Sequence, residues 1–193
     1  MNFKIENTNV YGVEEAVLAS GNSFRTEFRE LSDLNEKDWK RGIKLGAVDP
    51  GTGHDSFLNG ITVTMNITAP LYWWKQAQRY HWLEFVSSES TMHCVMKFDI
   101  KKQCVENTDK IILERMNQLI ANYNEYPSEE KWRTIIASLP CGFCLGATLI
   151  TNYRQLKTIC KQRKGHRLKE WETFIDWCLT LPHFTELTGI EKE

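Results

Sequence analysis

Pro70 separates two stretches of the chain that have different hydrophobic periods. From Thr62 to Ile67, apolar and polar residues alternate, which is the period of a half-buried β-strand. From Leu71 to Val86, apolar residues lie on all sides of the helical wheel and include tryptophans at 73, 74 and 82, which predicts a mostly buried helix. A strand followed by a buried helix favours an α+β fold with a small central sheet packed by helices.

Other segments continue this mixture of periods. A Gly-, Pro- and Asp-rich loop at residues 49–56 precedes the strand, and loops of this composition often place side chains in functional sites. Helices are expected at residues 13–20, 29–47, 110–123, 128–139, 155–162 and 168–179. Because the sequence contains no internal repeat, low-complexity run or composition shift, we expect one domain over residues 1–193.

Composition and charge exclude several classes of protein. With 41% hydrophobic and 25% charged residues, the chain has the profile of a globular protein with a real core. Its 24 basic and 25 acidic residues leave a net charge of −1, which gives no global field toward DNA or an anionic membrane. Any phosphate-binding site must therefore be local.

Targeting and cysteine patterns indicate a cytoplasmic protein. The first ten residues lack the apolar core of a signal peptide, and no window approaches the ~20 apolar residues of a membrane span. In a reducing compartment the six cysteines are expected to be free thiols. Cys141-Gly-Phe-Cys144 has the spacing of a zinc or redox pair, but a lone pair favours structural thiols, and no metal site is expected. The basic run from Lys157 to Lys169 is interpreted as a solvated face around Arg163, and nucleic-acid binding is not expected.

Residues 69–93 read APLYWWKQAQRYHWLEFVSSESTMH. In the flavin-dependent thymidylate synthases a strand ends in Ala-Pro, and a helix then presents Gln, two residues and Arg-His-Arg, followed later by Glu-x-Ser-x-Arg. This chain resembles that family at Ala69-Pro70, Gln76 and Arg79. Fifteen residues before Ala69 the family has His-x-Thr, and here His54-Asp55-Ser56 stands at the same spacing.

Two more segments match the family in phase. Leu139-Pro140 resembles a Leu-Pro pair, and twelve residues after Pro140 stands Asn152-Tyr-Arg154, similar to an Asn-x-Arg pair that binds the flavin. Arg163 lies nine residues beyond Arg154, where the family has a nucleotide-binding arginine. The resemblance covers residues 50–175, and Ser23 matches loosely a serine that contacts the flavin.

The resemblance implies an enzyme that uses FAD to transfer a one-carbon unit to C5 of dUMP or a related uracil nucleotide. Methylene-tetrahydrofolate and NADPH would be co-substrates, and the protein would form a homotetramer with active sites at subunit interfaces. The implied cofactor-binding residues are Ser23, His54, Ser56, Arg79, His81, Asn152 and Arg154. The implied substrate-binding residues are Gln76, Arg79, Glu89, Thr91, His93 and Arg163. The arginines suit this role because a guanidinium binds phosphate with a planar, always charged fork.

The departures from the family pattern support an alternative. Arg-His-Arg becomes Arg79-Tyr80-His81, and Glu-x-Ser-x-Arg becomes Glu89 to His93 after an insertion of two residues. Ile136 stands where an arginine is expected before Leu-Pro. A neutral histidine cannot form a bidentate fork with phosphate. The alternative is a catalytically inactive or retargeted homologue that binds a nucleotide-like ligand, and Gln76, Arg79 and His81 would then be polar tips of a core helix.

Overall fold

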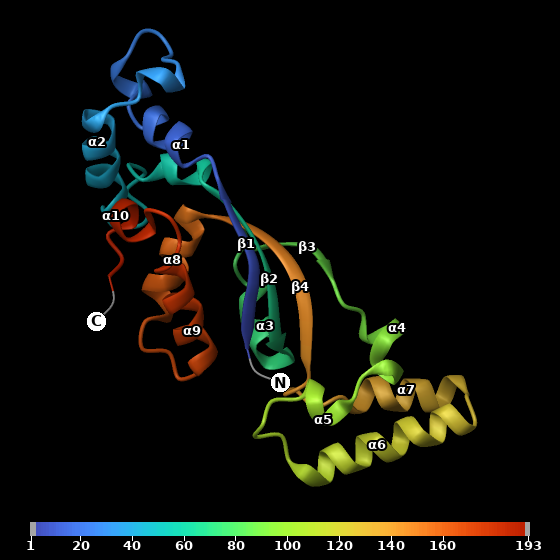
Figure 1. Ribbon diagram of the computed structural model, residues 1–193. Coiled ribbons are helices and arrows are strands. Elements are labelled where there is room, and N and C mark those ends of the chain that lie inside the picture. Colours follow the sequence, from blue (N-terminus) through green and yellow to red (C-terminus); the bar gives the residue numbers. More distant parts are fainter. Residues whose placement is uncertain (1–2, 192–193) are drawn as a thin grey trace. The chain divides into compact units, whose positions relative to one another are not determined.

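The computed structural model describes residues 3–191 and has an α+β fold built on one four-stranded antiparallel sheet (Figure 1). The strand order is β1-β2-β4-β3. The strands are β1 (Lys4–Tyr11), β2 (Thr62–Pro70), β3 (Glu84–Ser88) and β4 (Cys144–Asn152). Val63, Met65 and Ile67 are fully buried on one face of β2, as the alternation of this segment predicts. The predicted α+β class is confirmed.

The described residues form two compact units. The first unit comprises residues 3–6, 66–79 and 85–148, and the second comprises residues 7–65, 80–84 and 149–191. Strands β1, β2 and β4 each pass from one unit into the other. A single domain over residues 1–193 stays a prediction.

The first unit has its own apolar core beneath a pair of helices. Its helices are α3 (Leu71–Ala77), α4 (Thr91–Cys94), α5 (Ile100–Gln103), α6 (Lys110–Glu125) and α7 (Glu129–Ser138). Asp109 caps α6 by accepting from the Ile111 N–H, and Ser128 caps α7. Met116, Ile120 and Ile135 from these two helices join one buried cluster. The helices predicted at 110–123 and 128–139 are confirmed.

The second unit consists of helices, short 3-10 turns and the other ends of the long strands. Its helices are α1 (Val13–Ala19), α2 (Glu36–Gly46), α8 (Tyr153–Arg163), α9 (Lys169–Cys178) and α10 (Phe184–Thr188). The 3-10 turns are η1 (Asn22–Phe24), η2 (Leu31–Asp33) and η3 (Ser56–Gly60). Helix α8 is buried on nearly every side, and α9 and α10 pack against it. The helices predicted at 13–20, 155–162 and 168–179 are confirmed.

Two predicted helices are wrong in part. The helix predicted over Leu71 to Val86 ends at Ala77, and β3 follows after a turn. Trp73 and Trp74 are buried in α3, but Trp82 is exposed. The predicted helix looked apolar on all sides because the segment combines apolar residues of two different elements. Of the helix predicted over 29–47, only Glu36–Gly46 forms, because Asn35 and Asp38 make a capping box that starts the helix there. No helix in residues 3–191 is both long enough and apolar enough to span a membrane.

Candidate functional site

Three side chains that the resemblance assigns to the flavin line one cavity of about 480 Å³ in the second unit. Ser23 comes from η1, His54 from the loop before η3, and Ser56 from the start of η3. Ala19, Phe24 and Phe57 add apolar surface. Within residues 3–191, the side chains of Ser23, His54 and Ser56 have no hydrogen-bond partner, so two hydroxyls and one imidazole remain available to a ligand.

A buried ion pair holds the loop that carries His54 and Ser56. Asp55, between them, is fully buried and accepts from Arg154 Nε at 3.0 Å and from Lys157 Nζ at 2.9 Å. Lys157, also fully buried, donates to the carbonyls of Gly46 at 2.7 Å and of Val48. All three ammonium hydrogens therefore have acceptors, which a buried charge requires.

This arrangement corrects one prediction. The basic run from Lys157 to Lys169 is not a solvated face at its start, because the side chain of Lys157 in α8 is fully buried. At the exposed side of the same loop, Lys161 Nζ donates to Asp49 Oδ1 at 2.6 Å, and this hydrogen bond lowers the pKa of Asp49. Helix α8 thus fixes the loop at two points.

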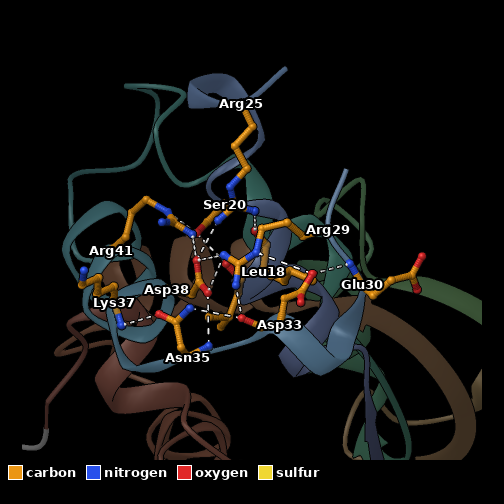
Figure 2. Close-up of polar contacts among 11 residues, drawn as sticks. Leu18, Ser20, Arg25, Arg29, Glu30, Asp33, Asn35, Lys37, Asp38 and Arg41 are labelled. Carbon is orange, nitrogen blue, oxygen red and sulfur yellow. Dashed lines mark hydrogen bonds and ion pairs between the residues drawn. The ribbon is translucent and has the colours of Figure 1, made fainter. Parts of the chain in front are cut away.

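Figure 2 shows a second network, centred on Asp38, in the same unit as the cavity. Asp38 of α2 is buried, and three guanidinium groups converge on its carboxylate. Arg25 donates at 2.7 Å, Arg29 at 3.0 Å and Arg41 at 2.6 Å, and the Asn35 N–H donates at 3.2 Å. Burial by itself raises the pKa of Asp38, but the hydrogen bonds from Arg41, Asn35 and Arg29 outweigh burial and lower it to about 2.

The network reaches the cavity wall at Ser20, and Gly21 packs on its arginines. Arg41 Nε donates to Ser20 Oγ at 3.2 Å, and that hydroxyl donates to the Val17 carbonyl at 2.6 Å. A Cβ on Gly21 would stand 2.5 Å from the Arg41 guanidinium and 2.7 Å from that of Arg25. The turn that presents Ser23 therefore packs directly on two arginines, and Ser20 serves this support rather than a ligand.

Asn152 and Arg154 line a second cavity of about 610 Å³ in the same unit. Asn152 is the N-cap of α8, where its side chain accepts from the Gln155 N–H at 2.9 Å. Because β4 ends at Asn152, the cap places Arg154 in the first turn of α8. Trp82 and Gln155 also line this cavity.

Arg163, assigned to the nucleotide, lies at the end of α8 beside a third cavity of about 520 Å³. Its Nε donates to the Tyr80 hydroxyl at 2.7 Å, and its guanidinium stands 4.5 Å from the Trp171 ring centre and 5.3 Å from that of Tyr80. These contacts fix the guanidinium by cation–π attraction and a hydrogen bond. Lys161, Lys164 and His166 line the same cavity.

The other assigned residues are not among those that line these three cavities. Gln76 lies in the last turn of α3, while Arg79 and His81 lie exposed in the turn after the helix. Glu89 Oε2 accepts from the Gly146 N–H at 2.6 Å, and the Glu89 N–H donates to the Gly146 carbonyl at 2.8 Å. Thr91 and His93 follow in the single turn of α4. Glu89, Thr91 and His93 thus share one short segment of the first unit, next to β4.

Sequence reasoning missed the residues that hold the cavities in place. Asp55 gave no motif because its basic partners Arg154 and Lys157 are about 100 residues away. Asp38 gave none because only Arg41 lies on its own helix, while Arg25 and Arg29 come from an irregular segment. The position of Lys157 on the inward face of α8 is the signal that could have indicated a buried pair, but the run was interpreted as a solvated face. In residues 3–191, no group of three His, Cys, Asp or Glu side chains is placed to hold a metal ion.

No family model matches the chain, and no curated protein does. Solved structures match nearly its whole length. The flavin-dependent thymidylate synthase ThyX from Helicobacter pylori, complexed with FAD and dUMP, has a TM-score of 0.72 at 14% identity over 97% of both chains. A second structure of ThyX from Helicobacter pylori with FAD and dUMP has a TM-score of 0.74 at 13% identity over 97% of both chains.

The third similar structure is a UMP/dUMP methylase, PolB from Streptomyces cacaoi, bound with 5-Br UMP. Its TM-score is 0.68 at 12% identity, over 97% of this chain and 94% of that chain. The chain therefore has the fold of the flavin-dependent thymidylate synthases and of a related nucleotide methylase. At these identities the likeness is one of fold.

Proposed function

We propose that this protein is a flavin-dependent enzyme that transfers a one-carbon unit to C5 of dUMP or a related uracil nucleotide. One observation carries the proposal: Ser23, His54 and Ser56, from two segments of the chain, line one cavity with side chains that have no other partner in residues 3–191. The similar ThyX structures hold FAD and dUMP. Methylene-tetrahydrofolate would supply the carbon, and NADPH the electrons.

The residues present fit FAD. The hydroxyls of Ser23 and Ser56 donate to phosphate or ribityl oxygens, and His54 offers an imidazole. Asn152 and Arg154 line the neighbouring cavity, and Arg154 brings a positive charge that a pyrophosphate requires. When bound, FAD supplies the redox chemistry that the side chains of this chain lack. The protein's own task is to orient the cofactor and the nucleotide and to exclude water.

The substrate half of the proposal rests on Gln76, Arg79, Glu89, Thr91, His93 and Arg163. Tyr80 and Trp171 orient Arg163, so its guanidinium is preorganised for an anionic group. The carboxylate of Glu89 accepts from the Gly146 N–H, and the Glu89 N–H donates to the Gly146 carbonyl, so Gly146 positions both groups. We propose a homotetramer, in which other copies of the chain complete each site.

Absorbance spectroscopy of the purified protein tests the cofactor. We expect flavin bands, or binding of added FAD near one equivalent per chain, and dUMP-dependent oxidation of NADPH that yields dTMP when methylene-tetrahydrofolate is present. A colourless protein that does not bind added FAD would overturn the proposal. Light scattering tests the tetramer independently of activity.

A retargeted homologue is the second candidate, and the histidine at position 93 favours it. His93 is exposed in α4, and an imidazole cannot form the bidentate fork that a guanidinium forms with phosphate. If His93 lies over the nucleotide phosphate, His93→Arg should tighten dUMP binding by about tenfold, because a charge-assisted contact is worth ~1.5 kcal/mol or more. Isothermal titration measures this change, and an unchanged affinity would remove His93 from the site. Flavin binding without dUMP turnover in both proteins would favour the second candidate.

A further inference from the structure

Gln155 carries a carboxamide without a hydrogen-bond partner in the described part of the chain. Its residue is 9% exposed, and its side chain lines the cavity that holds Asn152 and Arg154. The Gln155 N–H donates to Asn152 Oδ1, but the carboxamide makes no hydrogen bond within residues 3–191. An unpartnered carboxamide at a cavity wall can donate and accept hydrogen bonds with a ligand.

Trp82 lines the same cavity and is exposed. Its residue is 65% accessible, whereas Trp73 and Trp171 are fully buried in helices. An exposed indole does not contribute to the core, but it presents a flat apolar face on which an aromatic ring can stack. Trp82 and Gln155 line the same cavity within the second unit, so both can contact one ligand.

We propose that Trp82 and Gln155 form a site for a planar heteroaromatic ring of the flavin dinucleotide. Trp82 stacks on the face of the ring, and the Gln155 carboxamide binds its edge. A primary amide carries a donor beside an acceptor, so it pairs with a ring edge that offers an acceptor beside a donor. Both rings of FAD have such an edge: the lactam of the isoalloxazine and the amino-pyrimidine edge of adenine. This inference rests on the proposed function, because Asn152 and Arg154 of the same cavity are proposed to hold FAD.

Two variants test the pair, each with a matched control. Gln155→Leu removes the amide and keeps its bulk, and its control is Gln162→Leu, an exposed glutamine of the same helix. Trp82→Ala removes the stacking face, and its control is Phe28→Ala, an aromatic residue that is 89% exposed and lines none of the three cavities. Fluorescence titration measures the affinity for FAD, riboflavin and ADP, and calorimetry measures the melting temperature of the ligand-free protein.

We expect Gln155→Leu and Trp82→Ala each to weaken FAD binding by about tenfold, the size of one stacking or edge contact, while both controls keep wild-type affinity. The ligand-free Gln155→Leu protein should melt at the wild-type temperature, because the amide that is removed makes no hydrogen bond within the protein. A purely structural glutamine would lower the melting temperature. The fragment whose affinity falls, riboflavin or ADP, identifies the ring.

The outcomes separate this inference from the proposed function. Wild-type protein that binds FAD, together with both variants at wild-type affinity, would overturn the ring site and leave the proposed function intact. A lower melting temperature of ligand-free Gln155→Leu would also overturn it, since the amide would then have a partner in the protein. Gln155→Glu, which keeps the shape but loses the donor, repeats the affinity test if the leucine variant does not fold. Wild-type protein that binds no flavin would overturn both proposals.

Discussion

At the scale of single residues, Asp38 couples ionisation to folding. Its pKa falls from 3.8 to about 2 in the folded chain. A lowered folded-state pKa stabilises the protein above about pH 4, and this stabilisation is lost as the pH falls through about 2. At about 1.4 kcal/mol per pH unit, the contribution is about 2 kcal/mol at pH 7. We therefore predict that Asp38→Asn loses about 2 kcal/mol of unfolding free energy at pH 7.

Urea unfolding of both proteins at pH 7 and pH 2 measures this effect. The difference between wild type and Asp38→Asn should shrink toward pH 2, where the wild-type carboxyl is becoming protonated. Asp33→Asn is the control, because the Asp33 side chain is 51% exposed and lies 3.9 Å from Arg29. We expect it to change stability by less than about 1 kcal/mol. A difference for Asp38→Asn that is the same at both pH values would contradict the assignment.

At the scale of elements, α8 fixes the cavity loop through two lysines that differ in burial. Lys157 is fully buried with Asp55, while the Lys161–Asp49 pair lies at the surface. Lys157→Met leaves Asp55 with one charged partner, so we predict a loss of about 3 kcal/mol. Lys161→Met should cost less than about 1 kcal/mol. Thermal unfolding compares the stability that the two variants lose. Equal losses would show that burial does not determine how much an ion pair contributes to stability.

Two glycines of α2 should respond in opposite directions. A Cβ at Gly46 would stand 1.9 Å from the Leu187 carbonyl of α10, so Gly46→Ala must push the two helices apart and should cost about 2 kcal/mol. A Cβ at Gly42 would meet Val17 at 3.5 Å, an ordinary contact. Gly42→Ala should then stabilise by up to about 1 kcal/mol through helix propensity. The melting temperatures of the two variants show whether each substitution stabilises or destabilises the protein. A higher melting temperature for Gly46→Ala would contradict the close approach of α2 and α10.

The elements that sequence reasoning found are those with long apolar periods. Helices α6 to α9 were predicted near their true bounds because their inward faces repeat over several turns. Strands β1, β3 and β4 were not predicted. In β3 all five residues are exposed, so no alternation marks it. The segment after Ala77 was taken as helix because a short apolar run fits either period.

The candidate site was predicted unevenly for the same kind of reason. His54 and Ser56 have a spacing that resembles a family pattern, and Ser23 joins them in space. Asp55 and Lys157 are 102 residues apart, and only folding brings them together. Gln155 became a candidate only once its burial and its missing partner were known.

At the scale of the whole molecule, the fold persists at 12–14% identity to the similar structures. Cofactor binding should then appear in the stability of the whole chain. A ligand that binds only the folded state stabilises by about 2.7 kcal/mol at one hundred times its dissociation constant. For a chain of 193 residues this is a rise of about 5–10 °C in melting temperature.

The double variant Ser23→Ala/Ser56→Ala connects this rise to the first cavity. Both residues are exposed, and neither side chain has a partner in residues 3–191, so the ligand-free protein should melt as wild type does. Loss of two hydroxyl contacts should weaken FAD binding by about tenfold, which halves the rise at the same FAD concentration. Ser32→Ala, an exposed serine outside the three cavities, is the control. An undiminished rise in the double variant would place FAD elsewhere, because ligand stabilisation depends only on contacts made in the folded state.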